Sequence, residues 1–239
     1  MTRIHLAFLT AAVLWQAPAL AGQIFFSNLV QPGNQYGPDP LGIGHTPSFP
    51  PGDTGEIFGA TGFTATTDFR LTSIDIALGY ALGFPGNGPN QADVFLMSDS
   101  GGLPSSVIES WHLTGLPALC GPCPLTTIAS VSNPVLSAGD AYWVVASGGE
   151  QTFDLWSFTL TGNSFSPFAT KDIQNGVDSG WLLDTVNGRQ GALVVSGAAV
   201  PEPTSWTLTV SLLPAILVPR LRRRVLQAFS SQTASPHDR

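Results

Sequence analysis

Positive charge is scarce in most of this chain. Charged residues make up only 10% of its 239 residues, against about 25% in an average soluble protein. Between Gly22 and Ala199 there are three basic and fourteen acidic residues, a balance of −11. Nucleic-acid binding needs a basic footprint. The composition therefore predicts no nucleic-acid partner.

Cysteine is almost absent as well. The two that occur, Cys120 and Cys123, form a Cys-Gly-Pro-Cys sequence, which has the spacing of a thioredoxin redox pair. Redox use needs the first thiol at a helix N-terminus, but Pro117 precedes the pair, Pro124 follows it and no helical pattern comes after. A metal site would need a second pair of ligands. We predict a short-loop disulfide, with metal binding and redox chemistry as the alternatives.

Most catalytic motifs are missing too. The chain has no Gly-x-Ser-x-Gly and no His-Glu-x-x-His sequence. The sequence from Asp99 to Gly102 is similar to the nucleophile loop of chymotrypsin-like proteases, but a triad needs a base, and the central part offers only His45 and His112. We predict a hairpin turn at this position and no enzymatic activity.

Weaker alternatives remain for the acidic residues. Glu109 lies next to Trp111, a setting in which a carboxyl group and a sugar-stacking ring could meet in a glycan-active enzyme. Asp and Asn residues in the loops could hold a structural Ca²⁺, although no loop has the ligand series of an EF-hand. We expect no other cofactor and no metal centre.

The first 21 residues have the pattern of a secretory signal peptide. Arg3 supplies the positive charge, Leu6 to Trp15 supply the apolar region, and Ala19-Leu20-Ala21 is a small-x-small cleavage site. We therefore expect the protein to be exported.

The C-terminal part has a second processing pattern over residues 200–224. Val200-Pro201-Glu202-Pro203 is followed by an apolar stretch that ends at Pro219. As a helix, the 16 residues from Thr204 to Pro219 would span only about 24 Å of a bilayer core that is about 30 Å thick. This short hydrophobic helix is expected to be a transient anchor in the inner membrane. A cluster of stop-transfer arginines follows it, before a polar tail over residues 225–239: Arg220, Arg222, Arg223 and Arg224.

This order of parts resembles the PEP-CTERM sorting signal. Pro201, Glu202 and Pro203 match its motif residue by residue. The resemblance implies a bacterium that makes exopolysaccharide and a processing partner of the exosortase type, a membrane cysteine transpeptidase that acts at or near the Pro-Glu-Pro. It also implies a final location in the cell envelope, on the outer surface or in the extracellular matrix.

Residues 22–199 predict a single all-β domain. Apolar residues alternate with period two, or form dense runs typical of strands buried on both faces, and Gly-, Pro- and Asn-rich turns separate them. Such a pattern predicts an antiparallel β-sandwich of jelly-roll type with eight to ten strands. The predicted strands, of which 92–97 and 141–147 are the dense runs, cover residues 70–78, 92–97, 106–113, 141–147, 154–160 and 192–197.

The domain also resembles the choice-of-anchor domains, type R in particular. The matching features include Phe69 to Ile74 at the start of a strand, Leu136 to Trp143, and Ser179-Gly180-Trp181. The resemblance implies a β-sandwich module without an assigned activity. We expect a structural protein of the cell surface or exopolysaccharide matrix, and the alternative is a carbohydrate-binding module. Of the tryptophans, Trp181 is the least committed to a core.

Overall fold

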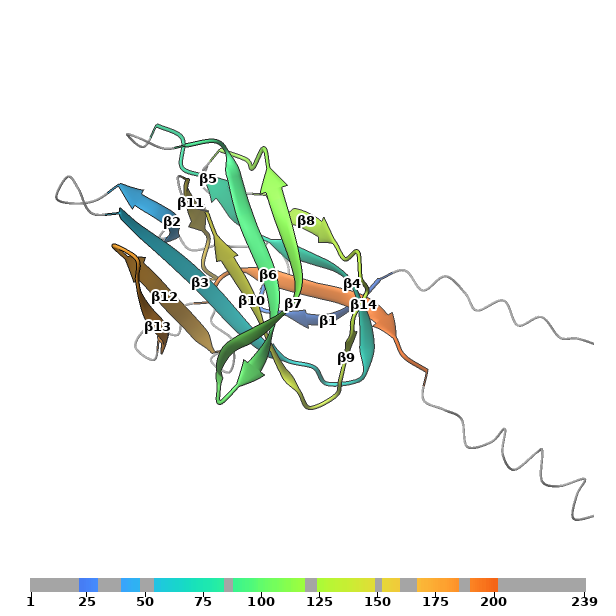
Figure 1. Cartoon of the computed structure of the whole chain (residues 1–239). Helices are drawn as coiled ribbons and strands as arrows, with labels where there is room; N and C mark the ends of the chain where they lie inside the picture. The colour runs from blue at the N-terminus through green and yellow to red at the C-terminus, as the bar shows by residue number, and fades with distance from the viewer. Residues whose placement is uncertain are drawn as a thin grey trace, which may run out of the picture. The chain divides into compact units, whose positions relative to one another are not determined.

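The computed structural model describes residues 22–29, 40–47, 54–83, 88–118, 124–148, 152–159, 167–184 and 190–201. The regular structure in these ranges consists of β-strands, and two antiparallel sheets face each other (Figure 1). The predicted β-sandwich is confirmed. The signal peptide, the pair Cys120–Cys123 and the C-terminal helix all lie outside the described residues, so they stay predictions.

The smaller sheet has five strands in the order β1-β14-β4-β8, with β9 also paired to β4. Its first and last strands along the chain are neighbours, and Gln23 lies opposite Gly197. The strands are β1 (Gln23–Ser27), β4 (Phe69–Ile76), β8 (Thr126–Ala129), β9 (Val135–Leu136) and β14 (Leu193–Ala199).

The larger sheet has nine strands, seven of them in the order β5-β11-β2-β3-β10-β6-β7. The hairpin β12–β13 is attached to β3. The strands are β2 (Leu41–Pro47), β3 (Thr54–Thr64), β5 (Leu78–Tyr80), β6 (Gln91–Ser100), β7 (Leu103–Thr114), β10 (Ala141–Ser147), β11 (Phe153–Trp156), β12 (Phe168–Gln174) and β13 (Val177–Leu183).

The larger sheet forks at β3. Residues 55–61 of β3 pair with β12, which occupies one edge of the strand. The other edge is shared by two strands, because β2 pairs with residues 54–57 and β10 with residues 59–64. The chain leaves β10 at Ser147 and re-enters the sheet at β11 on the other branch. At the crossing, a Cβ on Gly44 would lie 2.1 Å from the carbonyl oxygen of Thr152, so this position requires glycine.

The prediction of eight to ten strands is wrong, since the described ranges contain fourteen. The glycines of β3 conceal that strand in the sequence, because they occur where large side chains need room. A Cβ on Gly59 would lie 2.7 Å from Leu41, and one on Gly62 would lie 2.7 Å from Pro167.

Two predicted strands also end earlier than expected. The strand expected over residues 70–78 is split at Ala77, where the chain passes from β4 in the small sheet to β5 in the large one. The strand expected over 154–160 stops at Trp156, after which Phe158 makes a single bridge to Gly191. The dense run 141–147 coincides with β10 and is buried on both faces. The run 92–97 is not, since Asp93, Phe95 and Met97 are only partly buried.

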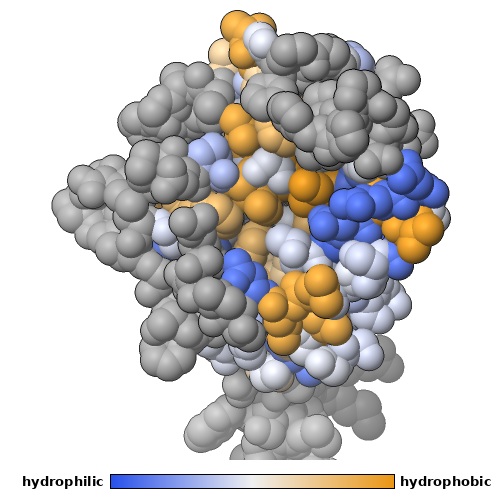
Figure 2. Space-filling model, turned by 90° about the vertical axis from the view of Figure 1, so that its left-hand side faces the viewer, coloured by the Kyte–Doolittle hydropathy of each residue, from blue (hydrophilic) through white to orange (hydrophobic). Residues whose placement is uncertain are grey.

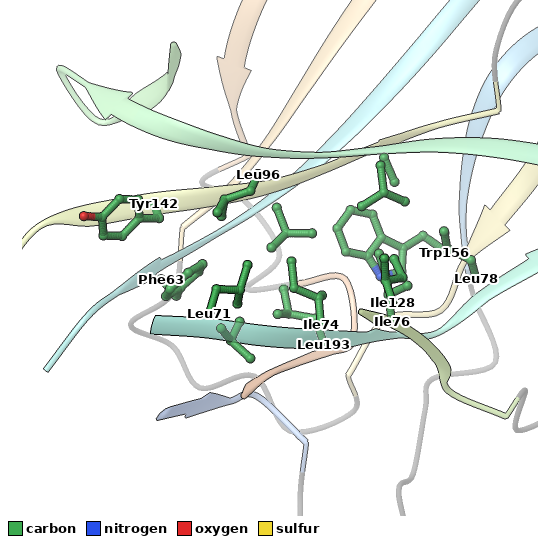
Figure 3. Packing of buried hydrophobic residues seen from close by; sticks show 14 of the residues in the cluster. Phe63, Leu71, Ile74, Ile76, Leu78, Leu96, Ile128, Tyr142, Trp156 and Leu193 are labelled. Atoms are coloured by element: carbon green, nitrogen blue, oxygen red, sulfur yellow. The ribbon is translucent and has the colours of Figure 1, made fainter. Parts of the chain in front are cut away.

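The main core lies between the two sheets (Figure 3). Side chains of both sheets interdigitate there, as expected for facing antiparallel sheets. Trp156 is fully buried in this core, and its Nε1 donates to the carbonyl oxygen of Ala192 at 3.2 Å. Gly191 lies against the indole ring, because a Cβ there would be 2.2 Å from Cε2 of Trp156. The core residues labelled in Figure 3 are Phe63, Leu71, Ile74, Ile76, Leu78, Leu96, Ile128, Tyr142, Trp156 and Leu193.

We predict that Trp156→Ala lowers the free energy of unfolding by about 3–5 kcal/mol, because it leaves a large cavity next to a glycine that cannot fill it. Urea denaturation followed by far-UV circular dichroism measures this change. Val131→Ala, at a residue that is 84% exposed, is the control and should shift the value by less than about 0.5 kcal/mol. Equal effects of both substitutions would contradict the central role of Trp156.

Candidate functional site

The motif at Asp99 forms the turn between β6 and β7. Gly101 and Gly102 both have positive φ, as a tight hairpin turn requires. One carboxylate oxygen of Asp99 accepts a bond from the Gly102 N–H at 3.0 Å, and the other accepts from Nε1 of Trp143 at 2.7 Å. The predicted hairpin turn is confirmed, and Asp99 holds it to the sheet.

The two histidines lie far from Ser100 of this turn. His112 bonds to Asp93 at 2.8 Å, but Asp93 and His112 are at the other end of the β6–β7 hairpin. At about 3.4 Å per strand residue, His112 lies about 30 Å from the turn. His45 is on β2, which is separated from β6 by β3 and β10. Neither His45 nor His112, the histidines that the structure describes, can therefore act as the base of a triad with Ser100.

Glu109 holds a loop in place. Its Oε2 accepts from the Ser130 hydroxyl at 2.7 Å, and its Oε1 accepts from the N–H groups of Val131 at 2.6 Å and Ser132 at 3.0 Å. Burial raises the pKa of this carboxyl group, but the hydrogen bonds from Ser130, Ser132 and Val131 together outweigh burial and leave the pKa below its usual value. A carboxylate bonded in this way is poorly suited to donate a proton to a glycosidic oxygen.

The four tryptophans of the domain divide between the two faces of the larger sheet. Trp111 packs against the main core at its edge and donates to the Ala129 carbonyl at 3.0 Å, and Trp156 lies inside that core. Trp143 and Trp181 belong to a second apolar cluster. Since Tyr142 lies in the main core and side chains alternate along β10, this second cluster lies on the outer face, which is turned away from the small sheet.

We call this second group the outer-face cluster. Its buried floor consists of Ala60, Trp143, Val145 and Ala169, and Phe58, Phe95, Met97, Leu103 and Trp181 pack against the floor while staying partly exposed. The sheet curls around the cluster. Strands β13 and β7 lie at opposite ends of the path β13-β12-β3-β10-β6-β7, yet their Cα atoms approach within 8 Å.

The hairpin β12–β13 is formed by an Asn-Gly turn. Asn175 and Gly176 have φ values of 50° and 78°, which fit the type I′ turn that this dipeptide favours. This hairpin is not among the predicted strands, although Asn-Gly between two apolar-rich segments is a strong hairpin signal. The edge strand β13 exposes Val177, Leu182 and Leu183.

Figure 2, which views the molecule from the left-hand side of Figure 1, shows apolar and polar surface interspersed.

A bulge in β13 directs Trp181 to the outer face. Asp178 lies opposite Ile173 and Trp181 lies opposite Lys171, so three steps along β13 match two steps along β12. Without the extra residue, Asp178 and Trp181 would point to opposite faces. The bulge is supported by Gly180, which has φ of 72° and whose N–H donates to Oδ1 of Asp178 at 2.8 Å. This bond, with Lys171 as a further cause, keeps the pKa of Asp178 below its usual value.

Lys171 connects the aromatic rings of this region. Its Nζ lies 4.6 Å from the ring centre of Phe58 and 5.5 Å from that of Trp181, which are cation–π distances. The same Nζ is 3.3 Å from Oδ2 of Asp178. The rings of Phe58 and Trp181 meet edge to face, with centres 6.4 Å apart. An aromatic surface, a donor and an acceptor therefore lie together on one face.

Asp154 is a second unusual feature. It is completely buried on β11, opposite Ile43 of β2 and Tyr80 of β5, and within the described ranges neither carboxyl oxygen has a hydrogen-bond partner. It shares a strand face with Trp156. Burial raises its pKa to about 7, because ionisation in apolar surroundings costs free energy.

No protein-family model matches the chain, and no curated protein matches its sequence. The described part of the chain contains no helix that is long and apolar enough to cross a membrane. Within the same ranges, no three His, Cys, Asp or Glu side chains come together as a group that could hold a metal ion.

The candidate site thus differs from the residues singled out in the sequence. Of the sorting motif, Val200 and Pro201 are described, whereas Glu202, Pro203 and the arginine cluster lie outside the described residues. Trp181 lies, partly exposed, at the edge of the outer-face cluster. Its neighbours Phe58, Lys171 and Asp178 were not expected, since the bulge and the strand pairing that unite them are not visible in sequence spacing.

We predict that the domain loses stability as the pH rises from about 4 to about 7. The unfolded chain ionises Asp154 near its ordinary pKa of 3.8, whereas the folded protein keeps it protonated up to about 7. Stability is therefore fully present below the unfolded pKa, falls through this window by on the order of 4 kcal/mol, and is constant above it. Urea midpoints measured across the window should become much less pH-dependent in Asp154→Asn and keep their slope in Asp140→Asn, a change at an exposed residue. A slope unaltered in Asp154→Asn would disprove the assignment.

Glu109→Ala should lower the free energy of unfolding by about 1–3 kcal/mol, because two backbone N–H groups and the Ser130 hydroxyl lose their acceptor. Glu109→Gln keeps one acceptor oxygen and should cost less. Thermal unfolding followed by circular dichroism measures both. If neither variant is destabilised, the hydrogen bonds of Glu109 to the loop have no structural role, and a functional role for Glu109 would be open again.

Proposed function

We propose that this chain is an exported, non-enzymatic protein of the bacterial cell surface or exopolysaccharide matrix, sorted through its C-terminal Pro-Glu-Pro. The observation that carries the proposal is the match between the fold boundaries and the two expected processing sites. Strand β1 begins at Gln23, two residues after Ala21, and β14 ends at Ala199, two residues before Pro201.

The start of the motif also ends the sheet pairing. Val200 N–H donates the last backbone bond of the described residues, to the carbonyl oxygen of Asp68 at 3.2 Å. Pro201 has no N–H group and cannot donate a further one. Cleavage before residue 22 and near residue 201 would leave all fourteen strands, including the β1–β14 pair, in the mature protein.

The positions of the acidic residues favour a role without catalysis. Glu109 and Asp99, the two acids that the sequence associates with catalytic motifs, hold a loop and a hairpin turn in this structure. Exosortase-type processing and a transient inner-membrane anchor are part of the same proposal, and both depend on the sequence from Val200 to Arg224.

The test uses the full chain, expressed in a bacterium that has an exosortase-type enzyme. Wild type should lose its tail near residue 200 and leave the inner membrane, as measured by intact mass and cell fractionation. Replacing Pro201, Glu202 and Pro203 by Ala should keep the full-length tail and the membrane fraction. Pro236→Ala, a proline outside the motif, should behave as wild type. If wild type and the motif variant both keep Arg220 to Arg224, the tail is an ordinary anchor and the sorting proposal fails.

A further inference from the structure

The aromatic rings at the edge of the outer-face cluster are partly exposed to solvent. Phe58 and Trp181 pack against the buried floor but stay partly exposed. Leu183, two residues from Trp181 on the same strand, is 45% exposed. The second sheet covers the opposite face, so these partly exposed rings lie on the outer face of a curled sheet.

The placement of Trp181 depends on a local irregularity. An unbroken strand would put its indole on the opposite face, and the bulge at Gly180, supported by Asp178, returns it to the face of Phe58 and Lys171. Bulges of this kind commonly re-aim a side chain next to a functional site. The main core does not need this arrangement, because Trp181 belongs to the other cluster.

The chemistry of the group fits a sugar. The faces of aromatic rings accept the apolar C–H surface of a pyranose, while polar groups at the ring edge bond to its hydroxyls. Lys171, whose Nζ lies over the Trp181 ring, offers ammonium donors, and Asp178, in contact with that Nζ, offers carboxylate acceptors.

The charge of this face argues for a neutral ligand. Among the residues that the structure describes, Lys171 is the single Lys or Arg of the larger sheet, since Arg70 belongs to β4 of the smaller one. Its charge is already paired with Asp178. Glu56 and Asp93 add negative charge on the same sheet, so a polyanion would meet net repulsion.

We propose that Trp181, Phe58, Lys171 and Asp178 form a binding site for a neutral polysaccharide, with Trp181 as the stacking platform. The inference deepens the proposed function, because such a site would hold the exported protein in a glycan matrix. It makes no use of the sorting tail, so binding and sorting can fail independently.

The test is affinity electrophoresis of the full chain, exported by an expressing bacterium, in gels that contain hydroxyethylcellulose as the neutral probe. Alginate and chitosan serve as the anionic and cationic probes. Wild type should be retarded by the neutral probe, and added salt should leave the retardation unchanged. Trp181→Ala should weaken binding by about tenfold or more.

Two further variants separate binding from folding. Leu182→Ala changes the next residue on the opposite face of β13, 61% exposed, and should bind as wild type. Gly180→Ala disfavours the positive φ of the bulge and should weaken binding while the urea midpoint moves little. Equal retardation of wild type and Trp181→Ala, or no retardation by hydroxyethylcellulose, would overturn the proposal. So would binding confined to alginate and lost in Lys171→Gln or in high salt, which would identify a polyanion site.

Discussion

Strand β10 is buried on both faces, and the arrangement of the larger sheet depends on this. Val144 and Ala146 face the main core, while Trp143 and Val145 belong to the outer-face cluster. A two-layer sandwich covers only one face of each sheet, so the outer side chains of β10 need another cover. The sheet supplies it by curling, which brings the β12–β13 hairpin and the start of β7 around Trp143 and Val145.

Glycine makes this arrangement sterically possible. Strand β3 is the branch point, with β12 on one edge and both β2 and β10 on the other. Gly59 leaves room for Leu41 and Trp156 on the core side, and Gly62 leaves room for Trp143 and Pro167 on the outer side. The same glycines lower the strand propensity of the segment, so packing in the folded protein overrides the local preference.

Period-two patterns in the sequence located the strands that have two clear faces. The run 141–147 corresponds to β10, and the fold class follows from such segments and their turns. Strand β3 was missed because its glycines resemble a turn. The change of sheet at Ala77 was missed because alternation continues through it, with Ile76 and Leu78 both buried. The site at Trp181 could not be predicted, since its face depends on one extra residue in β13 and its partners come from pairings distant in sequence.

The excess of acidic over basic residues has a structural explanation in the described part of the chain. Several carboxylates accept bonds from backbone N–H groups: Asp68 from Ala138, Asp99 from Gly102, Glu109 from Val131 and Ser132, and Asp178 from Gly180. Each of these acids holds a turn or loop through backbone N–H groups, and of the four only Asp178 also forms an ion pair with a Lys or Arg within the described residues. Asp154 is the opposite case, because it is buried with no hydrogen-bond partner among the described residues and stays protonated to about pH 7. These acidic side chains therefore stabilise turns and loops. On the outer face, aromatic rings lie next to the ion pair of Lys171 and Asp178.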